Sequence, residues 1–148
     1  MNIYLAGDHA GFALKEEIKR YLAGRGFPVQ DFGPVSLNPG DDYPDFVIPL
    51  ARKVAAEKDS RGITVAGSGQ GEAIAANKVK GIRAAVYYGG PLDIVRLSRQ
   101  DNDANVLCLG ARFITQEEAI DTVILWLETD FEGGRHERRI KKIGQIEQ

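Results

Sequence analysis

The order of secondary-structure signals along the chain is the sequence feature that most limits its fold. Between short apolar runs, apolar residues recur at the spacing of one helix face, as Leu14, Ile18 and Leu22 do. The apolar runs themselves are bounded by turn-forming residues and predict strands at residues 2–6, 28–32, 62–66, 82–86 and 106–109. Strand and helix signals therefore alternate along the chain.

The last part of the chain carries the clearest helix signals. Thr115 and Glu118 have the spacing of a capping box ahead of an apolar helical run. Gly133 and Gly134 then interrupt the chain before a final, basic helix.

This alternation predicts the fold class. Strands separated by helices of this length need crossover connections, which favour parallel pairing. We therefore expect an α/β fold in which residues 1–148 form one domain, with an open, mostly parallel five-stranded sheet of the Rossmann-like type and helices on both faces. Ligands of such sheets bind beyond the carboxyl ends of the strands. The candidate site residues are therefore those that follow the predicted strands, at 7–9, 41–43, 67–72 and 110–112.

The composition excludes several classes of protein. The chain has 148 residues, of which 43% are hydrophobic and 27% are charged. A domain of this size and composition buries enough surface on folding to be stable without a disulfide or a metal. A net charge of -2 argues against nucleic acid or an anionic membrane as a partner, and no apolar run approaches the ~20 residues that cross a bilayer. The first residues lack the basic and apolar regions of a signal peptide, so we expect a cytoplasmic protein.

The one cysteine, Cys108, lies in an apolar run, and we expect it to be buried.

A glycine-rich loop is the strongest single indication of a site. Residues 67–71 read Gly-Ser-Gly-Gln-Gly and lead from a predicted strand into a predicted helix. Such a loop presents several backbone N–H groups to one point, which suits an oxyanion or a phosphate. Other glycine loops fit less well. The dinucleotide fingerprint needs glycine or alanine where Glu72 stands, the Walker loop needs Gly-Lys-Ser or Gly-Lys-Thr, and the hydrolase elbow needs glycine at Ala66.

Glu72, directly after this loop, is the residue that we expect to act as a base. A carboxylate in the first helical turn can take a proton from a carbon while the loop stabilises the negative charge that develops on oxygen. The simpler explanation is that glutamate is favoured in first turns because it complements the helix dipole.

The final helix carries a cluster of basic residues. Arg135 and Arg139 are four positions apart, so both guanidinium groups project from one helix face and can hold a single phosphate. Arg112, which follows another predicted strand, is a candidate third ligand. A solvated helix face and a nucleic-acid patch are the alternatives, and the second lacks interleaved aromatic residues.

Several short motifs occur in order along nearly the whole chain. They are residues 7–11 (Gly-Asp-His-Ala-Gly), 42–44 (Asp-Tyr-Pro), 67–71 (Gly-Ser-Gly-Gln-Gly), 75–78 (Ala-Ala-Asn-Lys), 81–84 (Gly-Ile-Arg-Ala), 98–100 (Ser-Arg-Gln), 102–105 (Asn-Asp-Ala-Asn) and 133–136 (Gly-Gly-Arg-His). Together they resemble the ribose-5-phosphate isomerase B family, which includes the galactose-6-phosphate isomerase subunits.

The resemblance implies an aldose–ketose isomerase that moves a proton between C1 and C2 of a sugar phosphate through a cis-enediolate, without metal or organic cofactor. It implies ribose 5-phosphate as substrate, and a homodimer or tetramer in which two chains build each pocket and the C-terminal helix packs at the dimer interface. The residues that it assigns to catalysis are Glu72, Ser68, Asp101 and His9. The residues that it assigns to substrate binding are Asp8, Tyr43, Gly67, Gly69, Gln70, Gly71, Asn102, Arg112, Arg135 and Arg139.

Two positions depart from the family pattern. Many members carry a cysteine base where Ala66 stands, whereas a second branch uses a glutamate just after the loop, which Glu72 matches. Relatives generally carry a histidine, thought to open the sugar ring, where Asp101 stands. Since aspartate has an ordinary pKa near ~3.9, it is a poor acid at neutral pH. Either His9 takes over the ring opening or the preferred substrate differs.

Two alternatives to ribose 5-phosphate isomerisation stay open. One is a hexose 6-phosphate substrate, such as galactose or allose 6-phosphate. The other is a module that binds a phosphorylated ligand without catalysis, because fold alone does not specify function. A pure binding module has no chemical need for Glu72 beside the glycine loop.

Overall fold

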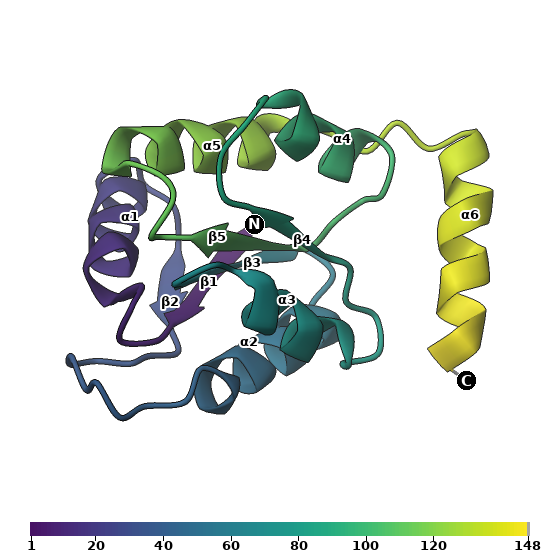
Figure 1. The fold of residues 1–148 in the computed structure, drawn as a ribbon. Coiled ribbons are helices and arrows are strands. Elements are labelled where there is room, and N and C mark those ends of the chain that lie inside the picture. Colours follow the sequence, from purple (N-terminus) through teal and green to yellow (C-terminus); the bar gives the residue numbers. More distant parts are fainter. Residues whose placement is uncertain (148) are drawn as a thin grey trace.

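A parallel β-sheet forms the centre of the computed structural model, which describes residues 1–147 (Figure 1). Its strands are β1 (Asn2–Gly7), β2 (Val29–Asp31), β3 (Ser60–Ala66), β4 (Ala84–Tyr87) and β5 (Val106–Gly110). They lie in the order β2-β1-β3-β5-β4, and every neighbouring pair is parallel. The strands expected from the sequence are confirmed, and the sheet is wholly rather than mostly parallel.

Helices cover both faces of this sheet, as expected. One face carries α1 (Phe12–Gly24), α4 (Asp93–Gln100) and α5 (Gln116–Glu128), and the other carries α2 (Pro44–Ala56) and α3 (Gln70–Asn77) (Figure 1). The apolar core accordingly has two parts. One includes the buried Ile18, Val95 and Trp126 under α1, α4 and α5, and the other includes Leu50 and Ala76 under α2 and α3.

Two of the helices differ in how clearly the sequence indicates them. The capping box of α5 is present, because Thr115 Oγ1 accepts from the Glu118 backbone N–H at 3.1 Å and the Glu118 carboxylate accepts from the Thr115 N–H at 3.0 Å. Sequence spacing does not indicate α4. Its apolar residues do not share one buried face, since Val95 is buried while Ile94 and Leu97 are exposed.

The last helix, α6 (Arg135–Gly144), stands clear of the sheet on the side away from α1, and the short 3-10 helix η1 (Gln145–Glu147) follows it (Figure 1). The buried His136 lies beside Asp101, which precedes β5, and the Glu147 carboxylate accepts from the Gly81 N–H, which precedes β4. Because both anchors precede strands, α6 lies at the amino-terminal edge of the sheet. Among residues 1–147, no helix has the length and apolar character needed to cross a membrane.

Candidate active site

A cavity of about 390 Å³ opens at the carboxyl-terminal edge of the sheet. The segments that line it follow β1, β3 and β5 or belong to the loop before α2. The lining residues are Asp8, His9, Ala10, Asp41, Asp42, Tyr43, Gly67, Ser68, Gly71, Glu72 and Arg112. The structure therefore brings together most of the residues that the sequence singles out, while Gly69 and Gln70 belong to the same loop without lining the cavity.

The glycine positions of the loop pack too tightly to admit a side chain. Gly69 has a φ of 78°, in the left-handed region that favours glycine, and a Cβ there would lie 2.9 Å from the Cys108 carbonyl oxygen. A Cβ on Gly71 would lie 2.4 Å from the Tyr43 hydroxyl oxygen. The loop thus holds the start of α3 against β5 and leaves the Tyr43 ring directly over Gly71. Gly71 lies in the first turn of α3, where backbone N–H groups have no partner within the helix.

Glu72 lies in this first turn and its side chain is directed to the cavity from a buried position. The residue is only 3% exposed, and its Oε2 atom has no hydrogen-bond partner among the described residues. Burial raises the pKa of the Glu72 carboxyl because it disfavours the charged form; the backbone N–H of the same residue opposes this effect, and the charge of Asp8 adds to it. A buried carboxylate with a free oxygen and a raised pKa is suited to accept a proton.

No thiol competes with Glu72 for this role. Ala66, where many relatives carry a cysteine, is buried at the end of β3. Cys108 is buried as expected, and burial raises the pKa of its thiol to about 12. It is therefore a neutral, packed side chain at neutral pH.

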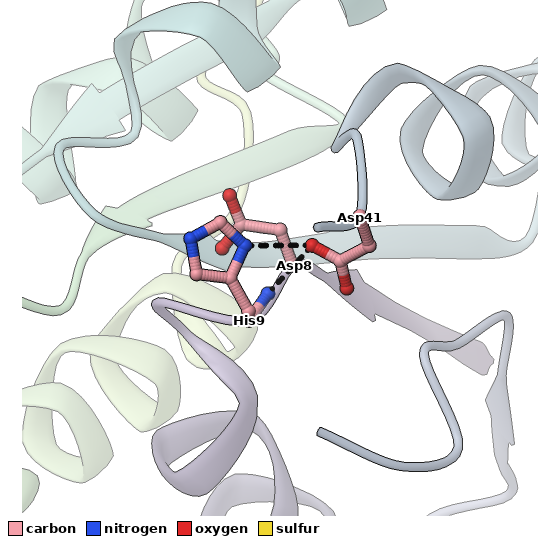
Figure 2. Close-up of side chains that lie close together, drawn as sticks. All are labelled: Asp8, His9 and Asp41. Atoms are coloured by element: carbon pink, nitrogen blue, oxygen red, sulfur yellow. Dashed lines mark hydrogen bonds and ion pairs between the residues drawn. The ribbon is translucent and has the colours of Figure 1, made fainter. Parts of the chain in front are cut away.

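His9 and Asp41 also line the cavity and form a close pair (Figure 2). His9 Nδ1 lies 2.8 Å from Asp41 Oδ1, and the His9 backbone N–H donates to the same oxygen at 3.0 Å. The neighbouring Asp8 accepts from the backbone N–H groups of Ala10 and Gly11 at 2.9 and 3.2 Å, which fixes the turn that carries His9. Both partners of the pair are thus held by the backbone.

The charge balance of the cavity is strongly negative. Its lining includes four carboxylates, on Asp8, Asp41, Asp42 and Glu72. Arg112 is the one arginine in that lining, and its guanidinium lies over Gly67, where a Cβ would be 3.0 Å from Cζ. One guanidinium beside four carboxylates is a weak site for a doubly charged phosphate.

The structure separates four of the predicted site residues from this cavity. Asp101 and Asn102 lie between α4 and β5, at the opposite edge of the sheet. Arg135 and Arg139 are both exposed on α6. Within one chain, therefore, the predicted phosphate cluster does not form with Arg112, and Asp101 does not face Glu72.

In the described part of the chain, residues 1–147, two groups of side chains have the composition of a metal site. Ligating atoms lie within 4.8 Å of one another in the group Asp8, His9 and Asp41, and also in the group Asp101, Glu132 and His136. In the first group the nitrogen and oxygen already face each other at hydrogen-bond distance. An ion there would have to replace this bond, so a hydrogen-bonded pair is the better description of the geometry.

Asp41 is a functional candidate that motif reading passed over. It is separated from His9 by 32 positions and belongs to a loop rather than to a strand or helix. The one available signal was the acidic loop at 41–43 itself, which the sequence indicated as part of the site region but without a role for Asp41.

Comparisons with known proteins extend over nearly the whole chain. Residues 3–143 match the family described as Ribose/Galactose Isomerase. The chain is 45% identical over 141 residues to the probable ribose-5-phosphate isomerase B of Mycoplasma pneumoniae, an alignment that covers 95% of this chain and 91% of that protein. It is likewise 45% identical over 141 residues to ribose-5-phosphate isomerase B of Escherichia coli, with 95% and 93% covered.

Solved structures show the same likeness in three dimensions. A crystal structure of ribose-5-phosphate isomerase B from Mycoplasma genitalium with bound ribulose-5-phosphate has a TM-score of 0.94 at 46% identity, covering 99% of this chain and 95% of that chain. The enzyme from Thermotoga maritima has a TM-score of 0.91 at 44% identity, covering 97% of each chain.

Proposed function

The chain belongs to the ribose/galactose isomerase family, and from this premise we propose that it interconverts ribose 5-phosphate and ribulose 5-phosphate with Glu72 as the base. The observation that carries the assignment of Glu72 is its buried Oε2 atom, which lies without a hydrogen-bond partner beside the glycine loop. A pure binding module has no need for such an atom, because an unsatisfied buried carboxylate costs stability.

The reaction is a proton transfer between neighbouring carbons. Glu72 removes the proton from C2 of the open-chain aldose and returns it to C1, so that an enediolate forms between the two steps. Backbone N–H groups at the start of α3 stabilise the negative oxygen of this enediolate. We assign the proton exchange between O1 and O2 to the Ser68 hydroxyl, which lines the same cavity. Asp8 and Tyr43 contact the sugar hydroxyls, and Arg112 contacts the phosphate.

A second copy of the chain completes the site in this proposal. The cavity of one chain has too little positive charge for a phosphate, whereas Arg135 and Arg139 are exposed on a helix that stands clear of the sheet (Figure 1). In a homodimer, which two further copies can extend to a tetramer, α6 of one chain brings both arginines to the cavity of the other, together with Asp101 and Asn102.

Exposed apolar side chains near the edge strand β4 support this arrangement. Ile74 on α3, Leu97 on α4 and Ile143 on α6 are 64%, 47% and 53% exposed. When a partner surface covers side chains of this size, the free energy falls because apolar area is removed from water. Because phosphorylated sugars are metabolites of the cell interior, we place the activity in the cytoplasm.

The proposal is tested by assaying the purified protein against pentose and hexose phosphates. We expect ribose 5-phosphate to give the highest kcat/KM of the panel, which includes galactose and allose 6-phosphate. A preference for a hexose 6-phosphate would move the assignment to that substrate, and the Asp101→His variant, assayed alongside, shows whether Asp101 sets the preference. Absence of turnover with every sugar would overturn the enzyme assignment.

A further inference from the structure

The proposed reaction needs an open-chain aldehyde, whereas an aldopentose 5-phosphate in water is almost entirely a closed furanose. The proton on C2 becomes acidic only when C1 is a carbonyl, so ring opening has to precede the action of Glu72. Ring opening needs a group that takes the proton of the O1 hydroxyl and a group that delivers a proton to the ring oxygen O4. Since O1 and O4 are both bonded to C1, a single well-placed nitrogen can reach both.

The pair of His9 and Asp41 has the geometry for this step. Asp41 Oδ1 accepts from the backbone N–H of His9 and lies 2.8 Å from Nδ1 of its ring. Figure 2 shows the ring with Nδ1 turned to Asp41 and the opposite nitrogen, Nε2, pointing away from it. The side chain of His9 is 36% exposed and lines the cavity, whereas that of Asp41 is only 6% exposed. An ionised Asp41 thus favours the tautomer with a proton on Nδ1 and an open Nε2.

The burial of Asp41 also suits a charge that acts through its neighbour. Its second oxygen, Oδ2, is buried and has no hydrogen-bond partner among residues 1–147. Few hydrogen bonds stabilise the charge of such a carboxylate. It is therefore stabilised strongly when the imidazole beside it becomes positively charged. The other acidic candidate for ring opening, Asp101, lies at the far edge of the sheet and reaches this cavity only from a second chain, whereas Asp41 contacts His9 within one chain.

We propose that His9 opens the sugar ring as a proton shuttle and that Asp41 is its positioning residue. In this step Nε2 takes the proton from the O1 hydroxyl, and a C1–O1 double bond forms as the C1–O4 bond breaks. The imidazolium, stabilised by the Asp41 carboxylate, then returns the same proton to O4, so that His9 is neutral again. The logic is that of the aspartate–histidine pair in serine proteases, in which the aspartate sets the tautomer and stabilises the cation. This inference rests on the proposed isomerase function and adds Asp41 to it.

The test compares a substrate that needs ring opening with one that does not. The 4-deoxy analogue of ribose 5-phosphate has no hydroxyl at C4 and therefore stays an open-chain aldehyde. For the Asp41→Asn variant we expect kcat/KM with ribose 5-phosphate to fall about 10²-fold, because the amide neither fixes the tautomer nor stabilises the cation. With the 4-deoxy analogue we expect a change of less than about 3-fold, because Glu72 still meets an aldehyde.

Asp45→Asn is the matched control. It removes the same charge four positions along the chain, at an exposed residue in the first turn of α2 that does not line the cavity, and should leave both substrates unaffected. Equal losses of the Asp41→Asn variant with both substrates, or no loss with either, would overturn the shuttle. A wild-type protein that turns over neither compound would instead overturn the proposed function, and the shuttle with it.

The tautomer provides a second readout that does not depend on activity. The chain has only two histidines, so ¹⁵N-histidine labelling gives spectra of the two rings that single variants assign directly. We expect the neutral His9 ring to carry its proton on Nδ1 in the wild type and to lose this preference in Asp41→Asn. A His9 ring that already carries its proton on Nε2 in the wild type contradicts the proposal.

Discussion

The two histidines of the chain each lie against an aspartate, but at opposite edges of the sheet. His9 approaches Asp41 through Nδ1 at 2.8 Å, at the carboxyl-terminal edge beside the glycine loop. His136 approaches Asp101 through Nε2 at 3.3 Å, at the amino-terminal edge where α6 begins. The His9 side chain lines the cavity and is 36% exposed to solvent, whereas that of His136 is 8% exposed.

The difference shows how position decides what a histidine–aspartate pair does. His9 keeps one nitrogen open to a ligand, so it can exchange a proton during a reaction. His136 is buried at the start of α6, so its pair with Asp101 holds that helix against the end of α4. In our proposal, the same two residue types thus serve proton transfer at one edge and the placement of Arg135 and Arg139 at the other.

Replacing each histidine by glutamine separates these two roles most strongly. We expect His9→Gln to lower kcat/KM for ribose 5-phosphate between about 10²- and 10⁴-fold with little change in the melting temperature, because a general base is lost at a partly exposed position outside the apolar core. His136→Gln should instead raise KM about 5-fold with kcat nearly unchanged, because about 1 kcal/mol of contact at the base of α6 is lost. Steady-state kinetics and thermal melts of both variants decide this, and a larger fall of kcat in His136→Gln would reverse the assignment of the pairs.

Gly71→Ala tests the packing of the cavity on the side of His9. A Cβ at this position would lie 2.4 Å from both Cζ and the hydroxyl oxygen of Tyr43, so the ring has to move. We expect kcat/KM to fall about 10-fold, because a small displacement of a positioning group misaligns the substrate. Gly24→Ala, where no atom lies within 4 Å of the added Cβ, is the control. Equal kinetics of the two variants would show that Tyr43 does not contact the sugar.

The pH dependence of kcat/KM is the smallest expected effect. Burial, aided by the charge of Asp8, raises the pKa of Glu72 above the usual glutamate range, although the backbone N–H of the residue opposes this shift. Because the deprotonated form is the base, activity should fall as the pH drops through this raised pKa, at a higher pH than for an exposed glutamate. Asp8→Asn removes the neighbouring charge and should move this acid limb to lower pH. If the acid limb stays at the same pH in Asp8→Asn, Glu72 is not the group whose protonation sets it.

The sequence predicts the edge of the sheet at which the site lies, because this prediction needs only strand order along the chain. Residues that follow buried parallel strands, such as Asp8, Gly67 and Arg112, meet at the carboxyl-terminal edge whatever the strand order in space. The capping box of α5 and the burial of Cys108 were equally predictable, because each depends on local spacing or on an apolar run.

The remaining features depend on contacts that no local pattern encodes. The pairing of Asp41 with His9 is set by the path of a loop over 32 positions. The separation of Arg135 and Arg139 from Arg112 is set by the direction in which the chain leaves α5, and the diglycine before α6 leaves that direction open. The apolar residues of α4 are divided between core and surface, so helical periodicity does not indicate this helix.

The central claim is that Glu72 carries the proton between the two carbons, and Glu72→Gln in deuterated solvent tests it most directly. We expect the exchange of the C1 hydrogen of ribulose 5-phosphate and the net isomerisation both to fall by about 10³-fold or more, because glutamine accepts no proton. Calorimetry should show that ribulose 5-phosphate still binds within about 3-fold of the wild-type affinity, because the phosphate and hydroxyl contacts are unchanged. A variant that binds the sugar and exchanges this hydrogen at the wild-type rate would contradict the account.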